Sequence, residues 1–258
     1  MISFPGVPVS PAKASQTARE RARAELTREI KEEARRQLAA VGADALSLRA
    51  VSRSLGMVSS ALYRYFPSRD DLLTALIIDA YNAIADTVDA ASAATPAGSA
   101  SASATSTPAG SLARWTAVCR AVRSWAHANP HEYALIYGSP VPGYRAPEAT
   151  IAPASRVPLA FLRIVRDAAA TGRLAPRDGA PPLEGPLAAQ AAALAIALAE
   201  LGVPQLPPDV LVRAVIAWTQ LFGMVSFELF GQFVGSFDPA GALFEHAVTA
   251  MATFVGLH

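Results

Sequence analysis

One low-complexity segment constrains the fold of this chain more than any other feature. From Ala90 to Ser111 the sequence contains only Ala, Ser, Thr, Pro and Gly. A segment without a large apolar side chain has nothing to bury in a core, so we expect a flexible connector whose first alanines can prolong the preceding helix. The chain therefore divides into a smaller part before this segment and a larger part after it.

The expected organisation has four parts. Residues 1–16, which contain prolines and serines, are expected to be a disordered tail, and residues 17–89 form a first domain. Residues 90–111 are the linker, and residues 112–258 form a second domain. Because 52% of the residues are apolar and alanine is frequent throughout, both domains have the material for a helical core.

The first domain shows helical periodicity with clear helix ends. Thr17 and Glu20 have the spacing of a capping box, and the helix that they open is expected to end at Gly42. Three further helices are predicted over about residues 48–55, 59–65 and 68–89. Ser47 caps the first of these and Ser68 the last, whose first turn also carries two acids that suit a helix N-terminus.

The second domain is also predicted to be helical. Its expected helices cover about residues 112–128, 155–170, 187–201, 208–233 and 239–255, and the proline- and glycine-rich passages 129–147 and 175–186 lie between them. No stretch alternates apolar and polar residues between turn signals, as a strand would. The fold class is therefore all-α, and the most apolar helices are expected to be buried rather than to cross a membrane.

Charge is concentrated locally. The net charge of +1 and the pI of about 7.9 give no overall field that would attract nucleic acid. Residues 45–69, however, contain no acid and four arginines, Arg49, Arg53, Arg64 and Arg69. Two short helices joined by a glycine-containing turn form a helix-turn-helix, and its tyrosines and arginines can contact phosphates. Pattern and charge alone leave open whether these helices bind DNA or only pack in a core.

The stretch "ALSLRAVSRSLGMVSSALYRYFPSRDDLLTALI" carries a more specific signal. It resembles the DNA-binding module of TetR/AcrR transcriptional regulators, whose hallmark corresponds here to Leu62, Tyr63, Phe66, Ser68 and Arg69. The resemblance covers about residues 20–88. It implies a homodimer of all-helical subunits that binds palindromic operator DNA, most often as a repressor, and that is released when the second domain binds a small molecule.

The resemblance also implies roles for individual residues. Phosphate contacts are implied for Ser47, Tyr63, Tyr65 and Arg69. Contacts with bases or with the groove wall are implied for Arg49, Ser59, Ser60, Ala61 and Arg64. The chain departs from the family at Val58, where a serine or threonine cap is usual. Arg19, Arg21 and Arg23 can be read as additional DNA contacts or, because acids are interleaved with them, as a solvated face.

The second domain resembles a TetR subgroup marked by Trp, His and Gly in one late helix. In "WTQLFGMVSFELFG" Trp218 and Gly223 are present, and Phe222 stands where the histidine would be. A cavity for a mostly apolar ligand is expected among Trp115, Trp125, Tyr133, Tyr137, Trp218, Phe222, Met224 and Phe227, with His127 or Glu228 as a polar group. Taken singly, each of these side chains is expected to be core, and only the group as a whole predicts a pocket among these helices. The last two long helices are the implied dimer interface.

The alternative is a helical small-molecule-binding protein or an enzyme with no role at DNA. The chain lacks the motifs of serine hydrolases, dinucleotide or phosphate binding and zinc proteases, so we expect no catalytic residue and no cofactor. His127 and His131 are four residues apart, but Pro130 is expected to end the helix between them, which argues against a metal site. The single cysteine, Cys119, is expected to be buried, and one cysteine with no secretion signal suits the cytoplasm.

Overall fold

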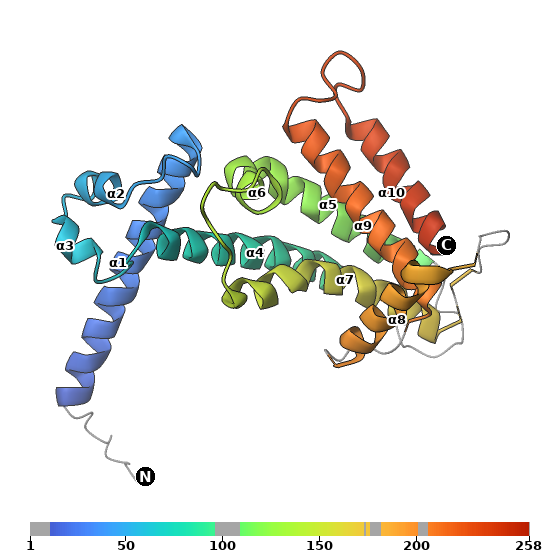
Figure 1. Cartoon of the computed structure of the whole chain (residues 1–258), viewed down its shortest axis with the longest axis horizontal. Coiled ribbons are helices and arrows are strands. Elements are labelled where there is room, and N and C mark those ends of the chain that lie inside the picture. Colours follow the sequence, from blue (N-terminus) through green and yellow to red (C-terminus); the bar gives the residue numbers. More distant parts are fainter. Residues whose placement is uncertain (1–10, 96–108, 173, 176–181, 201–205, 258) are drawn as a thin grey trace, which may run out of the picture. The chain divides into compact units, whose positions relative to one another are not determined.

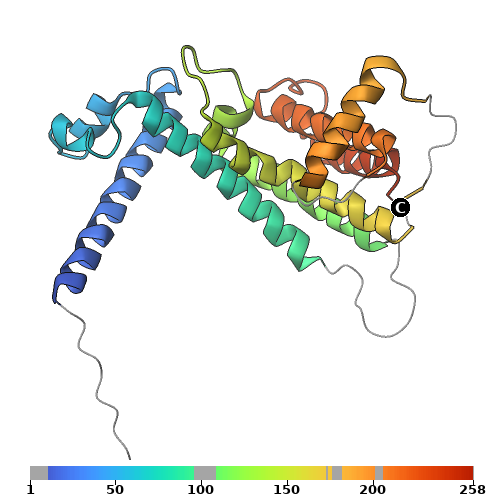
Figure 2. The same ribbon diagram turned by 60° about the horizontal axis from the view of Figure 1, so that its bottom comes forward.

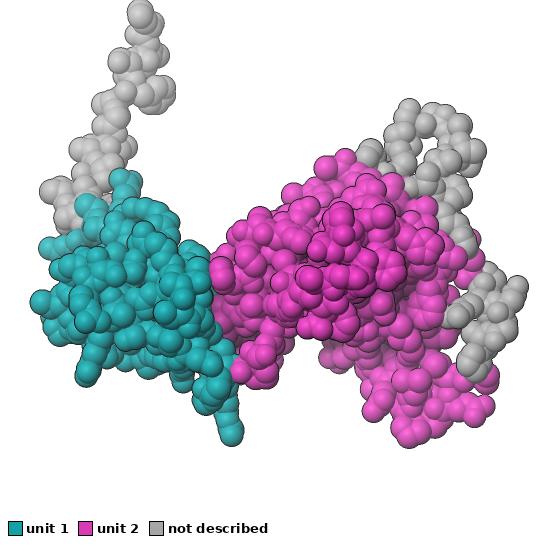
Figure 3. Space-filling model, turned by 90° about the horizontal axis from the view of Figure 1, so that it is seen from above, with its two compact units in different colours: residues 1–76, 141–145 teal, residues 77–140, 146–258 magenta. Residues whose placement is uncertain are grey.

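The computed structural model of the chain describes residues 11–95, 109–172, 174–175, 182–200 and 206–257. Over these residues it forms ten α-helices and one short 3-10 helix, without a strand, which confirms the all-α prediction (Figure 1). The chain divides into two compact units, coloured separately in Figure 3. Unit 1 comprises residues 1–76 and 141–145, and unit 2 comprises residues 77–140 and 146–258.

Unit 1 contains the helices expected for the first domain. They are α1 (Pro11–Val41), α2 (Leu48–Ser54), α3 (Ser59–Leu62) and the start of α4 (Arg69–Ala94). Helix α1 begins at Pro11, so the predicted start at a Thr17 capping box is wrong: both residues of that pair lie inside the helix. Helix α3 is shorter than predicted and continues as turns to Tyr65.

The predicted caps of α2 and α4 are confirmed. The Ser47 hydroxyl accepts a hydrogen bond from the backbone amide of Ala50 at 3.4 Å, and the Ser68 hydroxyl accepts one from the amide of Asp71 at 3.1 Å. Val58 occupies the N-cap of α3 and supplies no side-chain hydrogen bond, as its sequence position predicts. Gly56, in the turn between α2 and α3, has a φ of 64°, which glycine adopts without strain.

Unit 1 is built on a small apolar core. Its buried side chains come from the second half of α1, from the loop before α2, from α2, from the α3 region and from the first turns of α4: Ile30, Ala34, Leu38, Leu46, Leu48, Val51, Leu62, Phe66, Leu72, Leu73 and Leu76. The apolar spacing of three to four residues along α1 places its contacts on one stripe. The N-terminal part of α1, before Leu26, is exposed throughout its described side chains.

Unit 2 contains the rest of α4 and six further α-helices. They are α5 (Ala109–Ala128), α6 (Pro130–Tyr137), α7 (Ile151–Ala170), α8 (Gly185–Glu200), α9 (Pro208–Leu229) and α10 (Gly241–Val255), and the 3-10 helix η1 (Glu148–Thr150) precedes α7. Helix α6 lies in a passage for which no helix was expected. Pro130 ends α5, but proline is well suited to the first position of a new helix, because its missing N–H is not needed there.

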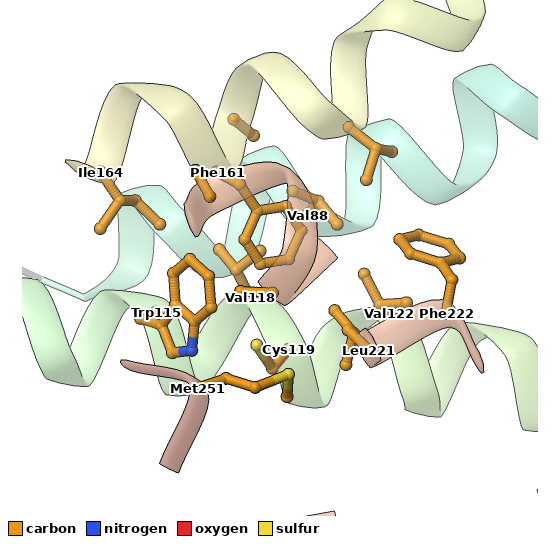
Figure 4. Packing of buried hydrophobic residues seen from close by; sticks show 14 of the residues in the cluster. Val88, Trp115, Val118, Cys119, Val122, Phe161, Ile164, Leu221, Phe222 and Met251 are labelled. Carbon is orange, nitrogen blue, oxygen red and sulfur yellow. The ribbon is translucent and has the colours of Figure 1, made fainter. Parts of the chain in front are cut away.

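The core of unit 2 is dominated by aromatic and branched side chains from α5, α7 and α9 (Figure 4). Trp115 of α5 is fully buried, donates its indole N–H to the carbonyl of Val248 at 3.2 Å, and meets the Phe161 ring edge-on at 5.1 Å between centroids.

Among the described helices, α9 alone is long and apolar enough to span a membrane by length and composition. Half of that window is buried inside the unit, as a core helix would be.

Leu62 and Tyr63 are adjacent, yet only Leu62 is structural. Leu62 is fully buried and Tyr63 is 42% exposed. Leu62→Ala should therefore lower the free energy of unfolding by about 3 kcal/mol, because it removes buried methyl groups and leaves a cavity. Urea denaturation followed by circular dichroism would measure this. Tyr63→Ala is the matched control and should change stability by less than about 1 kcal/mol; equal losses would contradict the assignment.

Candidate functional site

A hydrogen-bonded turn holds α2 and α3 together in unit 1. The amide of Met57 donates to the carbonyl of Ser52 at 2.8 Å, and the hydroxyls of Ser52 and Ser59 lie 3.2 Å apart. Ser52 is almost fully buried and also donates to the carbonyl of Arg49 at 3.0 Å. The oxygen of Ser59, predicted to face DNA, is thus already engaged in fixing the angle between the two helices.

The remaining predicted contacts of this unit lie at its surface. Arg49, Ser60, Tyr63 and Arg64 are exposed, whereas Ser47, Ala61 and Tyr65 are half-buried. Arg53, on α2, is exposed as well. The structure therefore brings three of the four arginines of residues 45–69 and one tyrosine to the surface of the two short helices, while Leu62 and Phe66 point into the core.

Arg69 is the exception among the predicted phosphate contacts. Its guanidinium donates to the carbonyls of Ala43 at 2.8 Å, Asp44 at 3.2 Å and Leu46 at 3.2 Å. These carbonyls belong to the loop between α1 and α2. Arg69 therefore ties the beginning of α4 to this loop, a role that its position in the sequence did not reveal.

An aromatic cluster forms in unit 2 between α4, α6 and α9. Phe222 lies 4.3 Å from Tyr137, 5.5 Å from Trp218 and 6.4 Å from Tyr133, between ring centroids. Tyr81 meets Tyr137 edge-on at 6.0 Å. The Tyr133 hydroxyl donates to the carbonyl of Phe222 at 3.1 Å, and burial raises the pKa of Tyr133 to about 12. Burial likewise raises the pKa of Tyr137.

The indole of Trp218 stands apart from the other polar groups of this cluster. Its N–H is buried and has no hydrogen-bond partner among the described residues. A buried donor without a partner costs about 1–3 kcal/mol, so this group is available to an acceptor that enters the cluster.

A groove of about 490 Å³ runs along α9 and α10, which lie side by side in both views (Figures 1 and 2). It is lined by Thr219, Gln220, Gly223, Met224, Phe227, Phe233, Leu243 and Ala247. Gly223 lies inside α9, and a Cβ added there would meet no atom within 4 Å. The packing of unit 2 therefore gives no reason for a glycine at this position.

Comparison with known proteins identifies both parts of the chain. Residues 30–76 match the family described as bacterial regulatory proteins, tetR family, and residues 115–251 match the one described as tetracyclin repressor-like, C-terminal domain. The HTH-type transcriptional regulators Mb1846 of Mycobacterium bovis and Rv1816 of Mycobacterium tuberculosis are each 40% identical over 240 residues, 92% of this chain and 95% of theirs. The chain belongs to the TetR family.

Solved structures agree with this membership. The proposed regulatory protein SCO4313 is 35% identical and superposes with a TM-score of 0.67, over 91% of this chain and 98% of its own. A TetR-family regulatory protein from Rhodococcus RHA1 has the same fold at 15% identity, with a TM-score of 0.55 over 90% and 97% of the two chains. As a TetR protein, the chain is a helix-turn-helix transcriptional regulator and not an enzyme. The family implies operator binding by its first part and effector binding by its second.

The predicted ligand-binding residues of this TetR protein do not form one site. Tyr133, Tyr137, Trp218 and Phe222 come together in the aromatic cluster, and Met224 and Phe227 line the groove. The others lie elsewhere. Trp115 and Trp125 are buried, Trp115 against Phe161, and His127 is exposed.

The polar group expected beside the ligand is already paired. Arg123 donates two hydrogen bonds to Glu228, at 2.8 and 2.5 Å, which hold the pKa of that carboxyl below its ordinary value. His127 Nε2 lies 3.3 Å from the same carboxylate.

Burial raises the pKa of the Cys119 thiol. The thiol is therefore protonated and unreactive, as expected of a core cysteine.

Several functional candidates were missed in the sequence. Tyr81 of α4 and Phe230 after α9 contact the aromatic cluster, and Leu243 lines the groove. In the sequence, the position of Tyr81 on the apolar face of its helix is the only feature that indicates a buried role. The groove itself could not be predicted, because it exists only once α9 and α10 are side by side, although Met224 and Phe227 of its lining were predicted as ligand contacts.

The three carbonyl contacts of Arg69 lead to a stability prediction. Arg69→Gln should lower the free energy of unfolding by about 1–3 kcal/mol, because partly buried carbonyls lose a charged donor. Differential scanning calorimetry would show this as a lower Tm. Arg64→Gln removes an exposed arginine from the same surface and should change stability by less than about 0.5 kcal/mol. Equal Tm values for Arg69→Gln and the unmodified chain would disprove the structural role.

Proposed function

We propose that the protein is a cytoplasmic, homodimeric repressor that binds a palindromic operator and is released by a small, mostly apolar molecule. The DNA-binding part rests on one observation: an acid-free surface of α2 and α3 exposes Arg49, Arg53, Tyr63 and Arg64 on helices whose geometry is fixed by buried groups. Arginine and tyrosine side chains are suited to phosphate oxygens, and arginine also to guanine edges.

Within this surface we propose two kinds of contact. Phosphates are contacted by Ser47, Tyr63, Tyr65 and Arg69, and bases or the groove wall by Arg49, Ser59, Ser60, Ala61 and Arg64. Arg69 and Ser59 already have partners in the chain, so their contribution is largely to position the surface. Tyr63 and Arg64 are the direct contacts that can be removed without disturbing the core.

Removal of the two direct contacts should abolish specific binding. Tyr63→Ala and Arg64→Ala should each weaken binding about tenfold or more, since a hydrogen bond to a charged group contributes about 1.5–3 kcal/mol. Fluorescence anisotropy with a duplex selected from a random library by the full chain would measure the dissociation constant. The logarithm of the binding constant should also fall steeply with the logarithm of the salt concentration.

The control for this experiment lies in unit 2. Ile151→Ser changes an exposed side chain far along the chain from α2 and α3 and should leave binding unchanged. Binding that survives the double variant Tyr63→Ala, Arg64→Ala, or that does not respond to salt, would contradict the proposed DNA contacts.

We further propose that α9 and α10 form the dimer interface. Ile216, Gly223 and Phe227 recur at intervals of four to seven along α9, and Ile216 and Phe227 are about half exposed. This stripe adjoins the groove, whose floor at Gly223 leaves room for the close approach of another helix. In a two-fold dimer, this stripe of one subunit would pack against the same stripe of the other, and the apolar side chains of both would be buried.

Charges placed on this stripe should separate the subunits. Ile216→Glu together with Phe227→Glu should convert a dimer, about twice 26.9 kDa, into a folded monomer, because a carboxylate in an apolar interface is costly. Sedimentation velocity would measure the mass. Ile151→Glu is the matched control, since Ile151 is 61% exposed but outside α9 and α10. A monomeric unmodified chain, or a dimer that persists in the double variant, would refute this interface.

The aromatic cluster is the proposed effector site. It comprises Tyr133, Tyr137, Trp218 and Phe222. The other residues that the sequence predicted for the same pocket lie outside this cluster: Trp115, Trp125, His127, Met224 and Phe227. Trp218 and Gly223 support a place in the subgroup marked by Trp, His and Gly, with Phe222 in the histidine position. Phenylalanine there favours an apolar effector, and the unpaired indole N–H of Trp218 favours one that carries a hydrogen-bond acceptor.

A further inference from the structure

The N-terminal half of α1 projects beyond the core of unit 1. All described side chains before Leu26 are exposed, and the first buried one is Ile30. At a rise of about 1.5 Å per residue, Arg19 lies about 16 Å along the axis from Ile30. A projecting helix of this kind gains little stability from packing. Contacts within the unit therefore do not account for its length, whereas binding to a partner would.

The charges of this projecting segment are unevenly matched. Arg28 is paired with Glu25 and Glu32, so these three side chains together carry one negative charge, and Glu20 stands between Arg19 and Arg21. Arg19, Arg21 and Arg23 have no ion pair with any side chain that the structure describes. Residues 18–25 contain three arginines and two glutamates, a net charge of +1, and their arginines are free to meet a partner. The sequence alone left a solvated face of interleaved charges as one of two interpretations.

Tyr65 holds one of these arginines beside the DNA-binding surface. The Arg23 guanidinium carbon lies 5.4 Å from the centroid of the Tyr65 ring, within the range of a cation–π contact. Tyr65 directly follows Arg64 in the turns after α3, so Arg23 is on the side of α1 that faces these turns. Arg19 precedes Arg23 by four residues and shares its face, whereas Arg21 is rotated by about 200° from both.

We propose that Arg19 and Arg23 bind phosphates of the DNA that flanks each half-site, so that α1 extends the footprint beyond the contacts of α2 and α3. This inference rests on the proposed operator binding. The 16 Å of projecting helix corresponds to about five base pairs at about 3.4 Å per step. Phosphate contacts do not depend on base sequence. They should therefore raise the affinity for a site with flanking DNA whatever the sequence of that flanking DNA.

Two duplexes and two variants test the proposal. One duplex is the palindrome selected from a random library by the full chain, trimmed to its symmetric bases, and the other carries six further base pairs on each side. The unmodified chain should bind the longer duplex about tenfold more tightly or better. The double variant Arg19→Gln, Arg23→Gln should bind both equally, and Arg21→Gln, the matched control, should keep the preference.

Salt and stacking provide independent readouts. On the longer duplex, loss of two phosphate contacts per subunit of a dimer should reduce the salt slope by about 3–4. Tyr65→Leu should reduce the preference for the longer duplex, because it removes the ring that holds Arg23, and Tyr65→Phe should retain that preference. A loss of affinity caused by misfolding alone would affect binding to both duplexes equally. Circular dichroism checks that each variant is folded.

The outcomes separate this proposal from the function on which it depends. Equal binding of the two duplexes by the unmodified chain, or an unchanged preference in Arg19→Gln, Arg23→Gln, overturns the role of α1 while DNA binding stands. If the full chain selects no duplex from the library, or if Tyr63→Ala and Arg64→Ala bind as the unmodified chain does, the proposed function itself fails.

Discussion

Burial of Leu62 and Phe66 is the constraint on which the DNA-binding surface depends. Helix α3 has four residues and cannot be stable as an isolated helix, because so short a segment has too few hydrogen bonds to offset the cost of nucleation. Its position comes from the two buried side chains and from the Ser52–Ser59 contact with α2. With these inside, Tyr63 and Arg64 are directed to solvent, where a partner can reach them.

The same region uses polar groups for structure as well as for recognition. Arg69 has the sequence context of a phosphate contact, yet its guanidinium fixes the loop that precedes α2. Ser59 was predicted to face DNA, yet its hydroxyl contacts Ser52 and so fixes the angle between α2 and α3. The free charge of the surface is consequently carried by Arg49, Arg53 and Arg64, which have exposed side chains.

Much of the architecture could be predicted because it is encoded locally. Apolar spacing and capping residues such as Ser47 and Ser68 located most helices of both units. Helix α6 was missed because Pro130 ends one helix and begins another, and the start of α1 was misplaced at an internal Thr17. Which aromatic side chains are core and which gather around Phe222 depends on how α4, α6 and α9 pack, so residue type alone did not separate them.

In the proposed complex, two copies of the α2–α3 surface bind one palindromic duplex. Hydroxyl-radical footprinting of the full chain on a duplex that it has selected tests this most directly, because it records backbone contacts on both strands. Two protected stretches related by the dyad of the palindrome are expected, with their centres about one helical turn or a multiple of it apart. A single protected stretch, or uniform cleavage along the duplex at saturating protein, would contradict it.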